Sequence, residues 1–436
     1  MGLLKTVGHL LLVAGLTLAA MCAALVVVNL IPNDRLLSHV RSSISEKNFL
    51  PSQLGIGQVD FWDECVGATL GLGHGADQMS IVRRSFLSPV IGNCDEFQKY
   101  ARGEMWVPLR SETGEALTPP NNLGFNYWRY WHGYQILTRP LLYCVKLYRL
   151  HYVLFVLFLL SGVFFVSQVS RFSGTCTWSL VIAFFCVPLV NQIPIMTHTM
   201  IWGVAFSIGG WLLLPSASGA KARRDLYAWF LLLGMLCSFV DLFTVPLVTL
   251  TVPLLGLYWK GKFDADSPKL TVRNILTLSA IWLAGYSFCW ATKWVIACMI
   301  GGAGAITDLT GIIERRIGIG SSPLGDEGQA FSVSPARSIF VNARVCWYGL
   351  MIVTGLAAAR IGPLSKAILS RKNWDLRAIA VPLVLFGMPV VWLAVVEQHS
   401  IWHAWYVSRI YFSSFAIVIA FILAAGSNPK SDNTVK

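Results

Sequence analysis

The chain has 436 residues, of which 55% are apolar and only 13% are charged, and its mean hydropathy is +0.60. A water-soluble protein of this length would not expose so much apolar surface, so the composition indicates a polytopic membrane protein. The net charge of +12 lies largely in short loops and therefore reports membrane orientation. No RNA- or DNA-binding pattern is present, and we expect no nucleic-acid partner.

The first apolar run, residues 7–31, is too long for a signal peptide and suits an uncleaved spanning helix, so we assign residues 1–31 to it. Nine further apolar stretches follow. We therefore predict an all-α integral membrane protein with about ten transmembrane helices. The nine stretches are residues 151–168, 175–192, 200–216, 227–242, 244–259, 275–298, 339–359, 379–397 and 410–425.

The loops between these stretches predict the orientation. Lys and Arg are concentrated in loops on the side of both termini, which the positive-inside rule makes cytoplasmic. We predict a large exoplasmic loop with interfacial helices, then helices 2–7, a second exoplasmic loop, helices 8–10 and a cytoplasmic tail. Their bounds are residues 32–150, 151–298, 299–338, 339–425 and 426–436.

Three acidic residues in the first long loop, Asp60, Asp63 and Glu64, are candidate catalytic groups. On a helix, Asp60 and Glu64 would lie one turn apart on the same face. Acids beside aromatic residues such as Trp62 suit general-base catalysis, because burial raises a carboxylate pKa toward the working pH. A solvated acidic turn is the alternative interpretation.

An aromatic and cationic cluster follows where the loop returns to the membrane. It predicts either an interfacial helix anchored by aromatic rings or a site for an anionic lipid headgroup, and one segment can serve both purposes. Its members are Trp128, Arg129, Tyr130, Trp131, His132, Tyr134, Arg139, Lys146 and Arg149.

Two charges lie inside predicted spans, Asp241 and Lys293. Intramembrane charges are costly and face a partner or a cavity. One interpretation is a structural salt bridge between the two residues. We favour the other, a polar cavity that opens toward the outer leaflet.

The connection EQHSIWHAWYVSR, residues 397–409, is unusually polar for a loop between two spans. His399 and His403 have a spacing that zinc sites use, but no third ligand is evident. Together with Arg409 they suit a phosphate better, through charge-assisted hydrogen bonds. An interfacial loop with aromatic anchors is the alternative.

Four segments resemble a family of largely uncharacterised bacterial polytopic membrane proteins, which implies the bacterial cytoplasmic membrane. The resemblance runs from about residue 60 to the C-terminal helices. The acidic motif of that family has Asp in a Trp-Thr-Asp-Ala setting, whereas this chain has Trp62-Asp63-Glu64-Cys65, so Glu64 is a substitution. The four segments are RYWHGYQILTRPLL, GMLCSFVDLFTVPLVTL, GYSFCWATKWVIA and HSIWHAWYVSR.

The overall plan also resembles the GT-C glycosyltransferases, helical membrane enzymes with a catalytic acid in a large first exoplasmic loop. Those enzymes transfer a sugar from a polyprenyl-phosphate carrier to an acceptor outside the cytoplasm. A strict analogy would place the acid nearer the first helix, at Asp34, which is our second choice.

The combined hypothesis is an inverting transfer from a polyprenyl-phosphate-linked sugar to a cell-envelope glycan acceptor. Glu64 or Asp60 would be the base, and Asp241, Trp131 and Trp62 would line the sugar cavity. These roles require no cofactor, although they are also compatible with a divalent metal ion between the acids and the phosphate. The lipid-phosphate ligands would be His399, His403, Arg409, Lys293, Arg129 and His132.

Three alternatives remain. A lipid-linked oligosaccharide transporter or flippase would use the same cationic and aromatic cavity without a base. A polysaccharide polymerase with a lipid-diphosphate donor predicts the same pattern of acids and arginines. A metal-dependent hydrolase built on the two histidines comes last.

Overall fold

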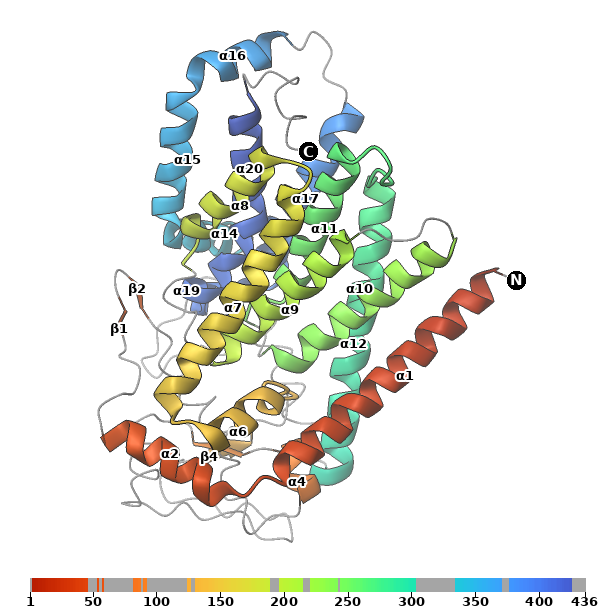
Figure 1. Ribbon diagram of the computed structural model, residues 1–436, viewed down its shortest axis with the longest axis vertical. Helices are drawn as coiled ribbons and strands as arrows, with labels where there is room; N and C mark the ends of the chain where they lie inside the picture. Colours follow the sequence, from red (N-terminus) through yellow and green to blue (C-terminus); the bar gives the residue numbers. More distant parts are fainter. Residues whose placement is uncertain are drawn as a thin grey trace.

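The computed structural model describes most of the chain (Figure 1). Elsewhere nothing is described, and this includes most of residues 46–129 and all of 303–333. The described ranges are residues 2–45, 53–54, 57–58, 81–87, 89–91, 124–126, 130–188, 196–214, 220–241, 244–302, 334–370 and 376–425.

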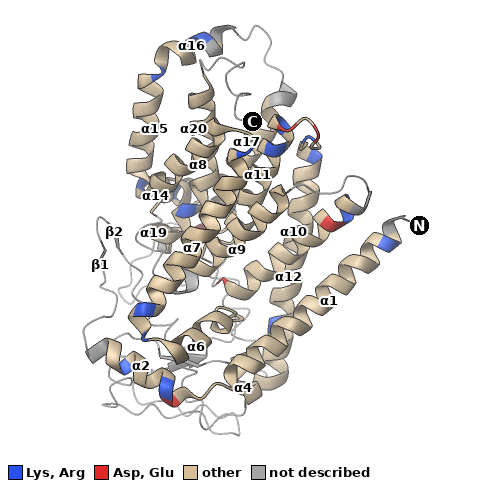
Figure 2. Ribbon diagram, viewed as in Figure 1, with Lys and Arg blue, Asp and Glu red and all other residues tan. Residues whose placement is uncertain are grey.

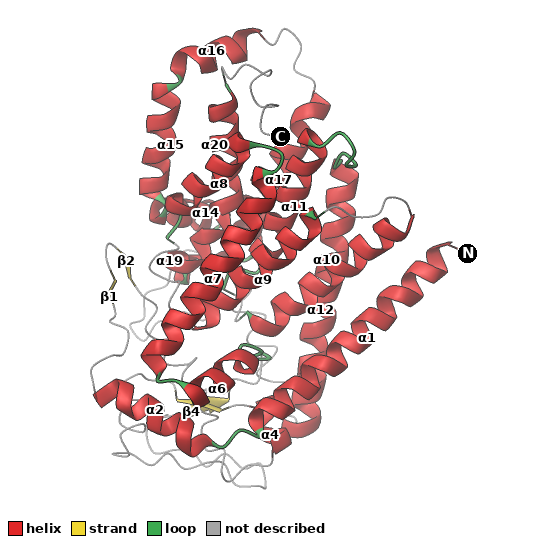
Figure 3. Cartoon of the chain, viewed as in Figure 1, coloured by secondary structure: helices red, strands yellow, loops and turns green. Residues whose placement is uncertain are grey.

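The described chain is overwhelmingly helical (Figure 3), which confirms the predicted all-α class. Its α-helices are α1 (Gly2–Asn29), α2 (Asn33–Ser45), α4 (Ile81–Leu87), α6 (Gln135–Cys144), α7 (Leu147–Ser170), α8 (Gly174–Cys186), α9 (Met196–Leu213), α10 (Ala220–Val240), α11 (Val248–Phe263), α12 (Val272–Gly301), α14 (Pro335–Val345), α15 (Trp347–Ala359), α16 (Ile361–Ser370), α17 (Leu376–Val395), α18 (Glu397–Trp402), α19 (Ala404–Val407) and α20 (Phe412–Ala424).

The remaining elements are short. A 3-10 helix, η2 (Ser408–Tyr411), joins α19 to α20. Strands β1 (Gln53–Leu54) and β2 (Gly57–Gln58) form one antiparallel pair, with Gln53 opposite Gln58. Strands β3 (Pro89–Ile91) and β4 (Gly124–Asn126) form another, with Val90 opposite Phe125.

Several helices are long and apolar enough to cross a bilayer, and the chain is a membrane protein. A described helix overlaps each of the ten predicted stretches. Within the described residues, four helices meet the length and hydropathy expected of a span, and a bent pair makes a fifth if it counts as one. The four are Leu4–Asn29, Leu147–Ser170, Val272–Gly301 and Ala404–Ala424.

The bent pair corrects the prediction of one continuous helix over residues 339–359. Helices α14 and α15 meet at Cys346 with a bend of 74°. The cause lies in the polar face of α14. Ser338 donates a hydrogen bond to the carbonyl of Leu393 over 2.8 Å, and Asn342 donates to the carbonyl of Ser400 over 2.9 Å. These bonds hold α14 against the end of α17 and the start of α18, while the apolar α15 takes another direction.

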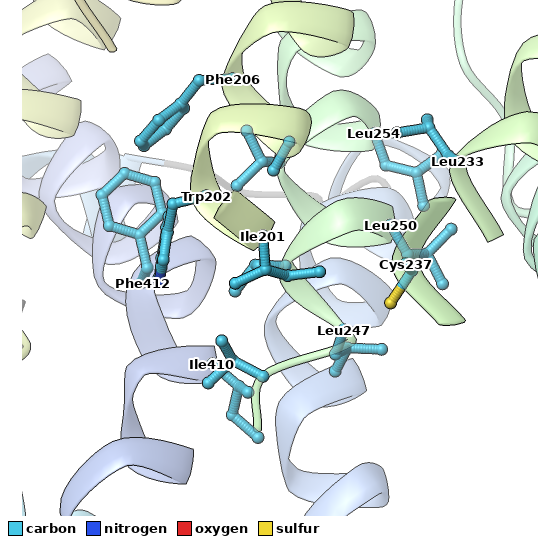
Figure 4. Close-up of a cluster of buried hydrophobic side chains, with 14 of the residues drawn as sticks. Ile201, Trp202, Phe206, Leu233, Cys237, Leu247, Leu250, Leu254, Ile410 and Phe412 are labelled. Carbon is cyan, nitrogen blue, oxygen red and sulfur yellow. The ribbon is translucent and has the colours of Figure 1, made fainter. Parts of the chain in front are cut away.

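The helices pack in pairs around one apolar core. Helix α10 lies along α12, α9 lies between α7 and α11, and α8 lies against α20. A cluster of side chains from α9, α10, α11 and the η2–α20 junction joins these pairs (Figure 4). It includes Trp202, Cys237, Leu247, Ile410 and Phe412, all of them buried. The predicted spans therefore meet as one bundle.

Two glycines allow α10 and α12 to approach closely. A Cβ atom added at Gly234 would lie 2.0 Å from the carbonyl oxygen of Trp282, and one added at Gly285 would lie 2.3 Å from that of Leu231. Small residues at such positions let helix backbones come together in membrane proteins. This contact fixes the position of Lys293, two turns further along α12.

We predict that Gly285→Ala destabilises the protein, because either the Leu231 backbone or α12 must move to admit the methyl group. The expected cost is about 1–3 kcal/mol. Thermal unfolding in detergent would show it as a lower midpoint. Gly203→Ala in α9 is the matched control, since nothing lies within 4 Å of an added Cβ there. Equal midpoints for the two variants would contradict the close contact.

Charged residues lie mostly toward the ends of the helices, and the middle of the bundle has few of them in this view (Figure 2). Basic residues lie at the start of α10, at the end of α11 and around α16, including Arg223, Lys262 and Lys366. The few charged side chains that are buried in the described residues therefore stand out.

Candidate functional site

The segment before α6 is a tight turn rather than an interfacial anchor. Tyr130, Trp131 and Tyr134 are each exposed by 5% or less, so the predicted aromatic belt is wrong for these three rings. They pack against protein, where an interfacial residue would meet lipid headgroups. Trp131 donates a hydrogen bond from Nε1 to the carbonyl oxygen of Cys289 over 2.9 Å, which ties the turn to α12.

Lys293 is fully buried beside this turn. Its Nζ donates a hydrogen bond to the carbonyl oxygen of Phe86 over 2.5 Å. It also lies 5.6 Å from the ring centre of Trp131 and 5.9 Å from that of Phe86, within the range of cation–π attraction. An ammonium group has three hydrogen-bond donors, and one of them binds the Phe86 carbonyl, so the site suits a ligand that brings a further acceptor oxygen.

Beyond Trp131, the turn before α6 runs from the Lys293 region toward the end of α10. His132 has φ of 57°, in the left-handed region that few residues other than glycine adopt. The next residue, Gly133, donates its N–H to the carbonyl oxygen of Phe239 over 2.8 Å, and a Cβ there would lie 2.3 Å from the ring of Phe239. Backbone strain of this kind is concentrated at functional sites.

Asp241 follows directly on α10 and is 3% exposed. Its Oδ1 accepts hydrogen bonds from the backbone N–H of Thr244, over 3.0 Å, and from the hydroxyl group of the same residue. Its Oδ2 is buried and has no hydrogen-bond partner among the described residues. Thr244 and the backbone N–H of Val245 thus fix the orientation of the carboxylate.

The polar connection after α17 is helical, and the predicted loop is wrong. Residues 397–411 form α18, α19 and η2, with a break at His403. The ring centres of His399 and His403 are 4.7 Å apart, and the His403 ring stacks on Tyr406 at 4.9 Å. The two imidazoles therefore share a face, as their spacing predicts.

Arg409 is the second buried cation of the site, with 1% exposure. Its Nε donates to the carbonyl oxygen of Tyr406 over 2.8 Å, and its guanidinium carbon lies 5.8 Å from the Tyr406 ring centre. Arg409 is close enough to Asp241 for its positive charge to act on that carboxylate. Ser408, beside it, accepts through its carbonyl oxygen from the Cys346 thiol at the α14–α15 bend.

The structure places Asp241 within electrostatic reach of Arg409 but keeps Asp241 and Lys293 apart. The salt bridge that was one sequence interpretation does not form, because Lys293 is bound to Phe86 and Asp241 to Thr244. Trp131 lies between Lys293 and the end of α10 that carries Asp241. Its ring is in contact with Lys293, and its ring centre lies 5.7 Å from that of Phe239.

Arg139, one of the cations of the predicted cluster, is also buried, and its partners were not predicted. Arg139 of α6 donates from Nε to Val28 O over 2.9 Å and from Nη2 to Ile31 O and Asn33 Oδ1, both over 2.8 Å. It therefore satisfies carbonyls at the C-terminal end of α1. Its motif, Arg139-Pro140, signals a special position, but the contact with α1 spans more than 100 residues.

The predicted catalytic acids are not described by the structure. Asp60, Trp62, Asp63, Glu64 and Arg129 all lie outside the described residues. Within them, the second-choice acid Asp34 lies exposed in the first turn of α2. Asp241 is the one buried carboxylate of the described part, and no group there combines three or more His, Cys, Asp or Glu side chains in a metal-binding arrangement.

Fold and site together define a helical membrane protein with buried charged side chains on α12, at the end of α10 and in the segment between α17 and α20, beside the turn before α6. Comparisons with models of protein families, with curated proteins and with solved structures found no match to this chain. The function is therefore argued from the site itself.

Proposed function

We propose that the chain is a membrane glycosyltransferase. It would move a sugar from a polyprenyl-phosphate donor to a glycan acceptor of the bacterial cell envelope. The observation that carries the proposal is the pair of buried cations, Arg409 and Lys293, in a bundle that also holds one buried carboxylate, Asp241. A phosphate headgroup with an attached sugar suits this site, because the phosphate can bind the cations and a sugar hydroxyl group can donate a hydrogen bond to the carboxylate.

The membrane arrangement that we propose has ten crossings of the bacterial cytoplasmic membrane, with both termini in the cytoplasm. Basic residues at the start of α10, the end of α11 and around α16 support this orientation. The loops at residues 32–150 and 299–338 would then be exoplasmic, on the side where lipid-linked sugars are used.

The proposed mechanism divides the chemistry among three regions. Arg409, with His399 and His403, would bind the donor phosphate, and Lys293, Arg129 and His132 would add positive charge. Stabilising the leaving phosphate lowers the barrier to displacement. Glu64 or Asp60, with Asp63 beside them, would remove the proton from the acceptor hydroxyl group, which then attacks the sugar carbon as the lipid phosphate leaves. Trp62 and Trp131 would line the sugar cavity.

A carrier for lipid-linked oligosaccharides is the second candidate. The observation that favours it is that the charged centre of the described residues contains two cations, aromatic rings and a carboxylate already held by Thr244. Such a site can bind a lipid phosphate without a catalytic base.

We predict that deletion of the gene removes one sugar or linkage from an envelope glycan, and that Glu64→Gln or Asp60→Asn removes the same one. An amide keeps the size of the side chain but cannot accept the proton. Mass and linkage analysis of the glycans from the four strains, at matched protein levels, is the measurement.

The strains separate the two candidates. If both amide variants restore the glycan that the deletion loses, the acids are not catalytic and the carrier is favoured. If the deletion leaves every glycan unchanged, the chain is not a transferase of envelope glycans.

A further inference from the structure

Asp241 has a feature that the proposed transfer does not by itself require. Its carboxylate is buried and held by Thr244, at Oδ1, and by the backbone N–H of Val245, yet Oδ2 has no hydrogen-bond partner among the described residues. Burying a charged group with an unsatisfied oxygen is costly, and native structures keep such groups where a ligand satisfies them or where they are strained for function. The fold around Asp241 holds this oxygen in one orientation.

The neighbouring charge decides which kind of ligand suits Oδ2. Arg409 acts on Asp241 electrostatically, so a metal cation at Oδ2 would be repelled by the guanidinium group. A phosphate at Oδ2 would be repelled by the carboxylate. A neutral hydroxyl donor meets neither penalty, and it makes a charge-assisted hydrogen bond to the carboxylate.

We infer that Oδ2 of Asp241 accepts a hydrogen bond from a hydroxyl group of the sugar while Arg409 binds the adjoining phosphate, so that the pair reads a phosphate-linked sugar as one unit. This inference rests on the proposed function and adds to it a specificity-determining residue. The apolar side chains of Cys237 on α10, Leu247 just before α11 and Ile410 in η2 (Figure 4) would exclude water from this hydrogen bond.

The experiment measures binding of the full chain, purified in detergent, to farnesyl phosphate and to farnesyl-phosphoryl glucose, galactose and mannose. Tryptophan fluorescence gives the Kd of each probe. The variant is Asp241→Asn, which keeps the side-chain shape but makes the acceptor neutral. Asp264→Asn is the matched control. Asp264 also accepts a hydrogen bond from a hydroxyl group three residues further on, that of Ser267, over 2.7 Å. It lies at the surface end of α11, where this hydrogen bond keeps its pKa below the ordinary value.

In the wild type and in the Asp264→Asn control, we expect at least one sugar ester to bind more tightly than farnesyl phosphate. In Asp241→Asn that preference should fall by about tenfold, while farnesyl phosphate binds as tightly as before or more tightly, since a nearby negative charge has gone. A misfolded variant would lose both probes, so retained phosphate binding excludes a general defect.

Three results would overturn the inference in distinguishable ways. If the wild type binds neither probe, the proposed phosphate site fails and the inference fails with it. If the wild type binds farnesyl phosphate but prefers no sugar ester, only the sugar contact is wrong. If Asp241→Asn keeps the preference for a sugar ester, the carboxylate is a structural group.

Discussion

Replacing Arg409 by glutamine is expected to abolish glycan transfer and to weaken binding of farnesyl phosphate by about 10–100-fold, the cost of losing charge-assisted hydrogen bonds. Arg409 is 1% exposed and held by Tyr406, so its guanidinium group is already positioned before a ligand binds. Its loss would also leave the nearby Asp241 carboxylate without a compensating positive charge.

The variant Arg409→Lys distinguishes the effect of the positive charge of Arg409 from that of the shape of its guanidinium group. Lysine keeps the positive charge but lacks the planar fork and the Nε–H that binds the Tyr406 carbonyl, so we expect a partial recovery of binding. Arg344→Gln, an exposed residue in the last turn of α14, is the control and should behave as wild type. Full glycan transfer by Arg409→Gln at normal protein level would show that Arg409 does not bind the phosphate.

Lys293→Met is expected to lose function without losing stability. Methionine fills nearly the same volume as lysine and removes a fully buried ammonium group, and exchanging buried charges for apolar residues is often neutral or stabilising by about 1–4 kcal/mol. The lost hydrogen bond to the Phe86 carbonyl offsets part of this gain, by about 1 kcal/mol. We expect an unchanged or higher midpoint of thermal unfolding and a loss of farnesyl phosphate binding.

The two readouts distinguish a functional lysine from a structural one. If Lys293 only holds α4 against α12, then Lys293→Met should lower the unfolding midpoint, and any loss of glycan should follow the loss of protein. Lys262→Met at the exposed end of α11 controls for removing a positive charge. A stable Lys293→Met variant that still binds farnesyl phosphate would remove Lys293 from the site.

The sequence alone located most of the groups that the structure assembles. Asp241 and Lys293 were selected because charges within apolar stretches are costly, and Arg409 because it accompanies two histidines in an unusually polar connection; all three are buried. The pairing of His399 with His403 also followed from helical spacing. Their partners did not follow, because Phe86, Thr244 and Tyr406 are ordinary residues whose backbone or hydroxyl groups become important only through their positions.

The errors concern long-range contacts. Aromatic residues beside cations, as at Tyr130–Tyr134, have the same local pattern whether they face lipid or protein, and only the contacts of Trp131 with α12 and Gly133 with α10 decide between the two. The break at Cys346 likewise depends on Ser338 and Asn342 reaching a segment more than 50 residues away.

The sequence by itself determined the class of this protein and the positions of its helices. Bilayer thickness demands long apolar runs and backbone hydrogen bonds made within each segment, and both requirements are local. The tertiary structure alone decided the surroundings of the buried charges: Asp241 lies within electrostatic reach of Arg409, and Lys293 lies against Phe86 and Trp131. Helices associate in a membrane through close packing of particular faces, as at Gly234 and Gly285, and no local pattern specifies which faces meet.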